Sequence, residues 1–279
     1  MPEIYQYFEN QSKIVPSFHN VTRIIHQSWK TNVIPHRYIN WAESWKNCFP
    51  NWTFILWTDE NNENFVKTHY PWFYERFINS PLNILRVDSV RYLYLYNYGG
   101  IYADLDNICF QPFEHLLENN GIVFGDMQYP KEYQNWMYIQ NSFMYSIARH
   151  PFWLDVMKSL LLKNGFGAPE ELTGPEMLMH SLQENWDKYN DIKIYGPKHF
   201  NPFSWYKKEY NEPCVDLNLL NEIEFRYCLE FHKSSYVLQL HVQSWGKGSF
   251  SSTLVLASGN AFKLYLLSLF IWIFLVYFQ

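Results

Sequence analysis

The sequence lacks the glycine motifs that most often bind phosphate groups. Its 279 residues contain neither a Gly-x-x-x-x-Gly-Lys-Ser/Thr loop nor a Gly-x-Gly-x-x-Gly turn, which excludes phosphate binding by a P-loop or by a dinucleotide fingerprint. A Gly-x-Ser-x-Gly elbow is also absent, so nothing in the chain indicates a serine hydrolase. A metal ion is the remaining means by which such a chain could handle a diphosphate.

Runs of like charge and paired cysteines are missing as well. The net charge is −5 with 18% charged residues, which argues against a nucleic-acid partner and favours a sugar, a nucleotide or a lipid-linked molecule. The four cysteines form no Cys-x-x-Cys pair, so we predict neither a zinc knuckle nor a dense disulfide framework, and the redox compartment stays open. Asn-x-Ser/Thr triplets at Asn10, Asn20 and Asn51 are expected by chance in an Asn-rich chain.

A long apolar run is present near the C-terminus, in residues 262–278, where Lys263 is the one charge. As a helix this run would extend roughly 25 Å, enough to cross a thin bilayer. A buried C-terminal helix is the alternative, but the run has no polar face. We therefore predict a transmembrane helix over 262–278. Lys247 and Lys263 weakly favour a cytosolic domain, and we expect no cleavable signal peptide.

Segments typical of strands and of helices alternate along the chain. Residues 22–30 predict a strand, residues 35–49 a helix with apolar side chains three and four apart, and residues 53–59 a short buried strand. The best-defined helix runs through residues 81–98 and ends at Gly99-Gly100. We expect further helices in residues 64–80, broken at Pro71, and in 112–120, 150–165 and 175–186, and further strands near 101–103, 121–126, 192–197 and 236–242.

This alternation predicts an α/β protein with a sheet covered by helices on its faces. No internal repeat, linker or low-complexity tract divides the chain. The economical division is one domain over residues 1–253 and the apolar segment at 262–278.

Two carboxylates, Asp104 and Asp106, interrupt an apolar segment in "LYNYGGIYADLDNICF". Residues i and i+2 of a strand face the same side, so we expect both carboxylates to project together while Leu105 points into the core. Such a pair at the carboxyl end of a strand can bind Mn²⁺ or Mg²⁺. The alternative is a solvated strand end, because Asp-x-Asp is a common pattern.

Asp88 and Arg91 lie three residues apart on the preceding helix and share one face. An ion pair on the helix surface is the usual role of such a couple. If the helix packs against the Asp104 strand, the pair could instead orient sugar hydroxyls.

His241 follows a strand-like run in "LQLHVQSWG". A lone histidine is more often structural, but a neutral imidazole beside two carboxylates is a suitable third metal ligand. Ser244 and Trp245, just beyond it, could reach a diphosphate with a hydroxyl and an indole N–H.

Several segments together resemble the glycosyltransferase family with a DXD sugar-binding region. This family includes fungal initiating α-1,6-mannosyltransferases, inositol-phosphorylceramide mannosyltransferases and α-1,4-galactosyltransferases. The matching segments, in family order, are "RIIHQSWK", "SWKNCFPNWTFILWTD", "VDSVRYLYLYNYGGIYADLDNICFQPF", "NSFMYSIARHPFW", "TGP" and "HVQSWG". The long central segment is the specific one.

The resemblance implies a GT-A-like fold with a central, mostly parallel sheet flanked by helices, together with a nucleotide-sugar donor, a divalent metal ion and retention of the anomeric configuration. It implies that Asp106 ligates the metal and that Asp104 contacts the metal, the ribose or the sugar. Asp88 and Arg91 would hold the donor sugar, and the region of Trp29 would lie beside the nucleotide base.

By the same resemblance, Asn141 would approach the sugar and the acceptor. His241, Ser244 and Trp245 would close over the diphosphate. Family members often have an additional residue or two between the histidine and the Ser-Trp pair, so the spacing in "HVQSW" leaves these three roles open.

We therefore expect a metal-dependent retaining glycosyltransferase that uses Mn²⁺ or Mg²⁺. The leading donor is GDP-mannose, and the acceptor is a glycan or a glycolipid such as a sphingolipid head group. The protein would be anchored in an endomembrane, Golgi or ER, by its C-terminal helix. The alternatives are a galactosyl-, glucosyl- or N-acetylglucosaminyltransferase that uses a UDP-sugar, and a non-catalytic sugar-binding membrane protein.

Overall fold

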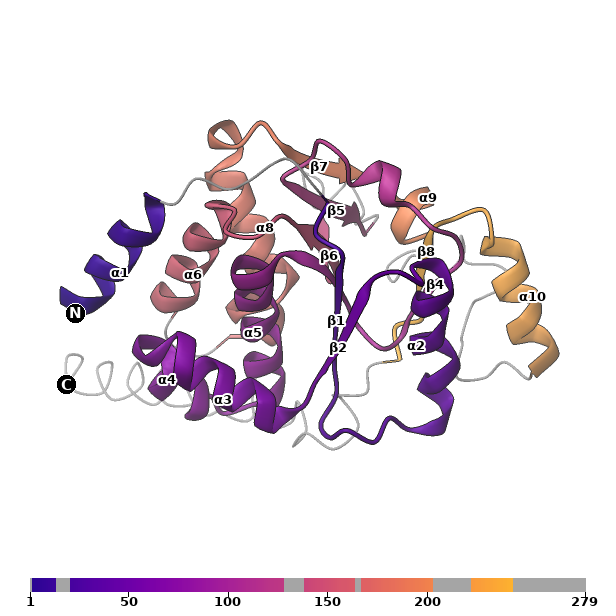
Figure 1. Cartoon of the computed structure of the whole chain (residues 1–279), viewed down its shortest axis with the longest axis horizontal. Coiled ribbons are helices and arrows are strands. Elements are labelled where there is room, and N and C mark those ends of the chain that lie inside the picture. The colour runs from indigo at the N-terminus through magenta and orange to yellow at the C-terminus, as the bar shows by residue number, and fades with distance from the viewer. Residues whose placement is uncertain (1, 14–20, 128–137, 164–166, 203–221, 243–279) are drawn as a thin grey trace, which may run out of the picture. The chain divides into compact units, whose positions relative to one another are not determined.

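The computed structural model describes residues 2–13, 21–127, 138–163, 167–202 and 222–242. Within these residues the elements are, in chain order, α1 (Pro2–Ser12), β1 (Ile24–Ser28), α2 (His36–Cys48), β2 (Thr53–Trp57), α3 (Asp59–His69), α4 (Pro71–Ile78), α5 (Asn83–Tyr98), β3 (Gly100–Ala103), β4 (Asn107–Cys109), the 3-10 helix η1 (Glu114–Leu116), β5 (Ile122–Asp126), β6 (Ile139–Ser146), α6 (Phe152–Leu162), α7 (Pro169–Leu172), α8 (Pro175–Glu184), the 3-10 helix η2 (Trp186–Lys188), β7 (Ile192–Tyr195), α9 (Pro197–Phe200), α10 (Glu222–His232) and β8 (Val237–Gln239). Figure 1 shows their arrangement.

Six strands form the main sheet in the order β2-β1-β3-β6-β5-β7. β1 pairs in parallel with β2 and β3, and β5 with β7, whereas β6 runs antiparallel to both β3 and β5. Five of the six strands therefore point the same way, which confirms the predicted mostly parallel α/β sheet. A separate antiparallel pair, β4-β8, forms a second small sheet.

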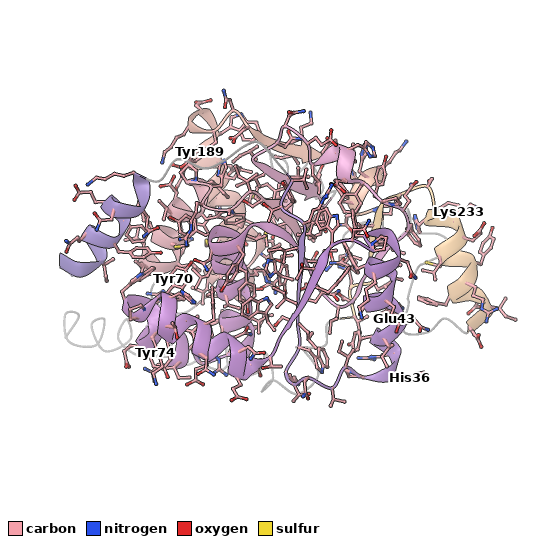
Figure 2. The ribbon with its side chains drawn as sticks, in the orientation of Figure 1. His36, Glu43, Tyr70, Tyr74, Tyr189 and Lys233 are labelled. Atoms are coloured by element: carbon pink, nitrogen blue, oxygen red, sulfur yellow. A yellow bond between two sulfur atoms is a disulfide. The ribbon has the colours of Figure 1, made fainter. Side chains whose placement is uncertain are left out.

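Hydrophobic cores cover both faces of the main sheet (Figure 2). On β3, Tyr102 faces the core that includes residues of α3–α6 and α8, whereas Ile101 and Ala103 face the core that contains Trp45 of α2. This alternation is what a strand with two buried faces requires. A third cluster joins α2, α10 and the β4-β8 pair.

Two glycines set the join between α5 and β3, as predicted. Gly99 ends α5 with φ of 68°, and Gly100 follows with φ of 95°. A Cβ on Gly99 would lie 2.5 Å from the Ala148 nitrogen, and one on Gly100 would lie 2.4 Å from the Ile24 carbonyl oxygen. Only glycine fits both the left-handed backbone and the close approach of β3 to β1.

Several expectations about elements need correction. β2 is not buried, because it lies at the sheet edge and its residues 54–57 are half-buried. Residues 112–120 contain only the short η1, because the chain turns at Asn119 with φ of 61°. The sequence analysis did not predict α1, β4, β6 or α10.

The remaining expectations concern residues outside the described part of the chain. These are the transmembrane helix at 262–278, the end of the domain at residue 253, and the positions of Ser244 and Trp245. Among the described helices, none combines the length and the apolarity needed to cross a bilayer.

Candidate functional site

Asp104 and Asp106 occupy a tight turn between β3 and β4. The Asn107 N–H donates to the Asp104 carbonyl oxygen at 3.0 Å, which closes a β-turn with aspartate at the first position, where it is favoured. The expectation that both carboxylates sit on a strand is therefore wrong: strand structure ends at Ala103. Leu105 is buried as predicted, with 4% exposure.

Arg91 of α5 lies at the centre of a buried polar cluster behind this turn. Its Nη2 is 3.0 Å from Asp88 Oδ1 and 3.5 Å from Asp104 Oδ1, and its guanidinium lies 4.6 Å from the centre of the Tyr102 ring. Tyr102 in turn donates to Asp104 Oδ1 at 2.7 Å. The Asp88–Arg91 couple is thus not a surface ion pair, and Arg91 connects α5 directly to the turn.

The solvent exposure of the side chains increases across this cluster, from Arg91 to Asp104. The side chains of Arg91 and Asp88 are 3% and 7% exposed, whereas that of Asp104 is 28% exposed. Asp104 is therefore the carboxylate of this cluster that a ligand can reach, and Arg91 and Asp88 support it from inside.

Asp88 has a hydrogen-bond donor for each oxygen. Asn141 Nδ2 donates to Oδ1 at 3.1 Å, and the Thr173 hydroxyl donates to Oδ2 at 3.3 Å. Burial raises the pKa of Asp88 to about 6, although the charge of Arg91 opposes this shift. Asn141, at the start of β6, also accepts from Arg91 Nη1 through its carbonyl oxygen, at 2.8 Å. The structure thus brings the predicted Asn141 to the predicted Asp88–Arg91 pair.

Asp106 is held from the other side, by the segment after β8. Its carbonyl oxygen accepts from the Leu240 N–H and its Oδ2 from the Val242 N–H, both at 2.9 Å. Burial and the charge of Asp104 raise the pKa of Asp106. His241 lies between these two donors with φ of 49°, so its backbone lies next to Asp106.

The two aspartates suit a hard divalent cation. The charge of Asp104 disfavours the ionised form of Asp106, and a bound cation would relieve that repulsion. Within the described residues, no three His, Cys, Asp or Glu side chains form a ligand cluster. A magnesium-like ion needs only one or two protein carboxylates when substrate phosphates and water complete its coordination, so the donor set fits. The assignment of His241 as a ligand stays a prediction.

Trp29 lies just past the carboxyl end of β1, where the parallel strand β3 also ends and the turn after β3 begins. The main-chain N–H of Trp29 donates to the Trp57 carbonyl oxygen at 2.9 Å, and the centre of its ring is 5.0 Å from the centre of the Tyr38 ring. The structure thus places Trp29 at the carboxyl ends of the parallel strands, where ligands bind to α/β sheets. Its role beside a base stays a prediction.

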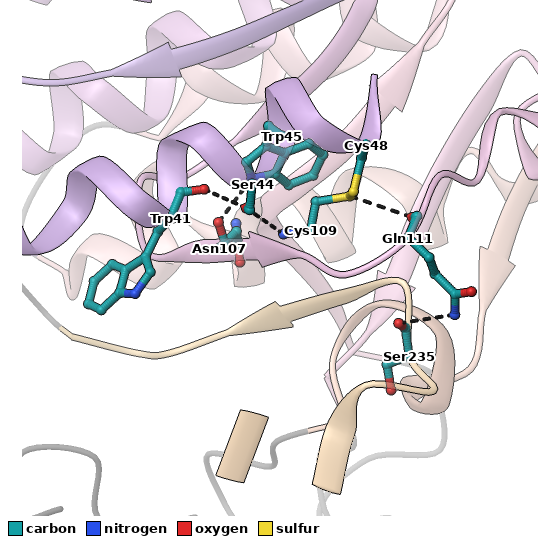
Figure 3. The surroundings of a disulfide bond; sticks show 8 residues. All are labelled: Trp41, Ser44, Trp45, Cys48, Asn107, Cys109, Gln111 and Ser235. Carbon is teal, nitrogen blue, oxygen red and sulfur yellow. Dashed lines mark hydrogen bonds between the residues drawn. A yellow bond between two sulfur atoms is a disulfide. The ribbon is translucent and has the colours of Figure 1, made fainter. Parts of the chain in front are cut away.

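A disulfide fixes the strand that follows the turn (Figure 3). Cys48, at the end of α2, is bonded to Cys109 of β4, 61 residues later. Beside it, Trp45 Nε1 donates to the Asn107 carbonyl oxygen at 2.9 Å, and the Cys109 N–H donates to the Ser44 hydroxyl at 3.0 Å. The sequence analysis did not foresee this bond, because cysteines far apart in sequence give no pairing signal.

Residue-level reasoning also missed Tyr102 and Thr173. In the sequence, Tyr102 looks like an ordinary aromatic residue of a strand, and Thr173 was noted only as part of the segment "TGP". The hydroxyls of both bind the site carboxylates. The available signal was the place of "TGP" among the segments that resemble the family.

Comparisons with known proteins match part of the chain to glycosyltransferases. Residues 35–123 match the family model described as "Glycosyltransferase sugar-binding region containing DXD motif". The chain is 36% identical over 162 residues to inositol phosphoceramide mannosyltransferase 3 of Schizosaccharomyces pombe, a match covering 56% of this chain and 40% of that protein. It is 36% identical over 154 residues to mannosyl phosphorylinositol ceramide synthase CSH1 of Saccharomyces cerevisiae, covering 55% and 37%.

The matches to these two curated relatives thus span less than half of each relative's length. Among solved structures, the PaToxG glycosyltransferase aligns over 85% of this chain and 97% of that chain, with a TM-score of 0.47 and 15% identity. A likeness at that level decides neither fold nor function.

Proposed function

We propose that the chain is a member of the glycosyltransferase family with a DXD sugar-binding region, whose model matches residues 35–123, and that it transfers a hexose from a nucleotide-sugar to a lipid-linked acceptor. One observation carries this proposal. The buried Arg91 joins Asp88 to Asp104 at the turn that bears Asp106, so the family's acidic motif sits on a preorganised charged cluster.

The residues of the cluster have separable tasks in the proposed reaction. Arg91, held by the Asn141 carbonyl oxygen and by Asp88, fixes the Asp104 carboxylate at the surface of the site. Asp104, the exposed member, accepts hydroxyl groups of the donor's sugar or ribose. Asp88 and Asn141 lie just behind it and shape the sugar subsite. Rigid placement of this kind lowers the entropic cost of reaching the reactive geometry.

Asp104 and Asp106 would hold Mn²⁺ or Mg²⁺, with His241 as a further candidate ligand, and Ser244 and Trp245 would contact the diphosphate. When bound, the cation neutralises charge that develops on the leaving nucleotide diphosphate. The family resemblance supports retention of the anomeric configuration, with the acceptor hydroxyl attacking the face from which the nucleotide departs.

For the donor we propose GDP-mannose, and for the acceptor a sphingolipid head group. Both curated relatives are named for the mannosylation of inositol phosphoceramide, and this supports mannose as the sugar and a sphingolipid head group as the acceptor. The apolar residues 262–278 support attachment to an endomembrane, which would bring the site to a lipid acceptor.

The test is turnover of the full-length chain in detergent micelles, with Mn²⁺ or Mg²⁺ and a panel of GDP- and UDP-sugars. We expect hydrolysis or transfer with GDP-mannose, and a loss of about 100-fold or more in Asp106→Ala. Asp187→Ala, at an exposed carboxylate of η2 before the amino end of β7, is the matched control and should retain activity.

The same panel separates the alternatives. Turnover of a UDP-sugar with none of GDP-mannose would keep the glycosyltransferase and replace the donor. Binding of a nucleotide-sugar without turnover, unchanged by Asp106→Ala, would indicate a non-catalytic binding protein and overturn the enzymatic proposal.

A further inference from the structure

Asn51 stands on a turn that holds its side chain in solvent. The Trp52 N–H donates to the Phe49 carbonyl oxygen at 3.0 Å, and Pro50 occupies the second position of this turn, where it is favoured. The two aromatic residues anchor the turn: Phe49 and Trp52 are 2% and 7% exposed, with ring centres 4.6 Å apart. Asn51 and Thr53, by contrast, are exposed.

These residues form the triplet Asn51-Trp52-Thr53, which is an acceptor sequence for N-linked glycosylation. From sequence alone the triplet carried almost no weight, because chance accounts for it. The structure adds the exposure of both Asn51 and Thr53, and it adds evidence about the compartment.

That evidence is the disulfide bonding. Cys48, three residues before Asn51, is bonded to Cys109, and Cys228 of α10 is disulfide-bonded as well. No free cysteine occurs in the described part of the chain. Disulfides form and persist in oxidising compartments such as the ER lumen and are rare in the cytosol. They outweigh the two lysines that favour a cytosolic domain, and N-glycosylation takes place in the same lumen.

We propose that this domain faces the lumen of the secretory pathway and that Asn51 carries an N-linked glycan there. In the transfer, the Asn51 amide nitrogen bonds to the anomeric carbon of an oligosaccharide linked to a lipid diphosphate. The bond from that carbon to the diphosphate oxygen breaks, and the lipid diphosphate leaves with the proton that the amide loses.

The position of the glycan is compatible with an open donor site. Asn51 precedes the amino end of β2, whereas Asp104 follows the carboxyl end of β3, and β1 runs parallel to both strands. Asn51 and Asp104 therefore lie at opposite ends of the parallel strands. The glycan would instead stand beside the outer side of β2, which pairs with no other described strand there and whose residues 54–57 are half-buried. Exposed strand edges promote association between molecules, and a bulky polar glycan would hinder it.

The direct test uses the unmodified full-length chain, produced in a eukaryotic host that performs N-glycosylation. A tryptic peptide spanning residues 47–67 contains both Cys48 and Asn51, and one spanning 92–131 contains Cys109. Mass spectrometry after peptide N-glycosidase treatment in heavy-oxygen water should find Asn51 converted to labelled aspartate. Without reduction, the same peptide should be linked to residues 92–131. An unmodified Asn51, or a Cys48 that alkylates as a free thiol, would overturn the proposal.

A matched pair of variants tests the effect on the strand edge. Thr53→Ser keeps the acceptor triplet and Thr53→Ala removes it, while both change the same exposed residue. We expect Thr53→Ala to lose one glycan by gel mobility and to associate more than Thr53→Ser in light scattering. Equal glycan content in the two variants would contradict the assignment of Asn51, regardless of how much of each variant folds. The readouts do not depend on transferase activity, so this inference can fail or hold independently of the proposed function.

Discussion

The two aspartates of the turn are held by two different regions of the molecule. Asp104 is bound by side chains attached to the main sheet and its helix α5, namely Arg91 and Tyr102. Asp106 is bound by main-chain N–H groups of the segment after β8. The first region is a charged cluster inside a large core, and the second is a small sheet joined to α2 by a disulfide.

The difference implies that the two carboxylates depend on different parts of the protein. Asp104 depends on individual side chains, so point substitutions should disturb it. Asp106 depends on the backbone position of a two-stranded pair, which is marginal by itself and needs support from neighbouring elements. Substitutions can test whether the two regions are separable in this way.

The largest effect should come from Arg91→Leu. The change removes the positive partner of Asp88, whose side chain is 7% exposed, and breaking a buried ion pair costs about 3–5 kcal/mol of unfolding free energy. Urea unfolding at pH 7 measures this loss. It should shrink at pH 5, because the pKa of Asp88 is about 6 with Arg91 present and rises further without that charge, so protonation removes the unpaired charge.

The double variant Asp88→Leu/Arg91→Leu is the control for this first prediction. It leaves no unpaired buried charge at position 88, so it should recover part of the lost stability. A double variant less stable than Arg91→Leu would show that packing, and not charge pairing, determines the effect.

The next effect should come from Cys48→Ser/Cys109→Ser. The bond closes a loop between residues 61 apart in sequence, and its removal should cost about 2–4 kcal/mol. Hydrogen exchange should accelerate at the Leu240 and Val242 amides, which bind Asp106, and little at the Asp104 amide, which binds Ser142 on the main sheet. Equal acceleration at all three would contradict the separation of the two regions.

The sequence predicted the first region far better than the second. The spacing of Asp88 and Arg91 put them on one helix face, and the glycines marked the end of α5. Both are local rules that act over a few residues of sequence. The second region depends on contacts between Cys48, Asn107 and the β8 segment, which lie far apart in sequence and follow no period.

The same contrast explains the error about the motif itself. Asp104-Leu105-Asp106 follows a strand and alternates polar with apolar residues, so it reads as strand. The turn is stabilised by the hydrogen bond from Asn107 and by β8, 130 residues later in the chain. Tertiary pairing of this kind overrides a local pattern.

The third prediction concerns pH and the first region. His26 of β1 is fully buried, accepting from Trp57 Nε1 at 3.0 Å and donating to the Gly99 carbonyl oxygen at 2.9 Å. Burial lowers its pKa to about 4 from 6.5, so the unfolded chain binds more protons than the folded one between these values. The contribution of His26 to stability is therefore present well above pH 6.5 and is lost on acidification, by about 1.4 kcal/mol at pH 5.5. The raised pKa values of Asp88 and Asp106 act in the opposite direction, so the His26 contribution is read from a variant.

His26→Gln should remove this contribution, measured by urea unfolding at several pH values as the difference in stability between the variant and the unmodified chain. The disulfide variant should retain the contribution, because His26 belongs to the main sheet. A difference that does not change between pH 4 and pH 6.5 would contradict the prediction and leave His232 of α10, whose pKa burial also lowers, as the histidine that opposes acidification.

The smallest effect should come from Thr173→Val, which preserves shape and removes one hydroxyl. That hydroxyl donates to Asp88 Oδ2 at 3.3 Å, and a neighbouring hydrogen bond from Tyr92 to the Thr173 carbonyl oxygen, at 2.8 Å, remains. The expected loss of stability is about 0.5–1 kcal/mol.

Without the Thr173 hydroxyl, Asp88 would keep hydrogen-bond donors on Oδ1 alone, and its carboxylate would be free to rotate. The KM for the donor should therefore rise by more than the small stability loss explains, whereas Thr173→Ser should behave as the unmodified chain. An unchanged KM in Thr173→Val would show that Arg91 and Asn141 suffice to orient Asp88, and the side-chain dependence of the first region would be narrower than its contacts indicate.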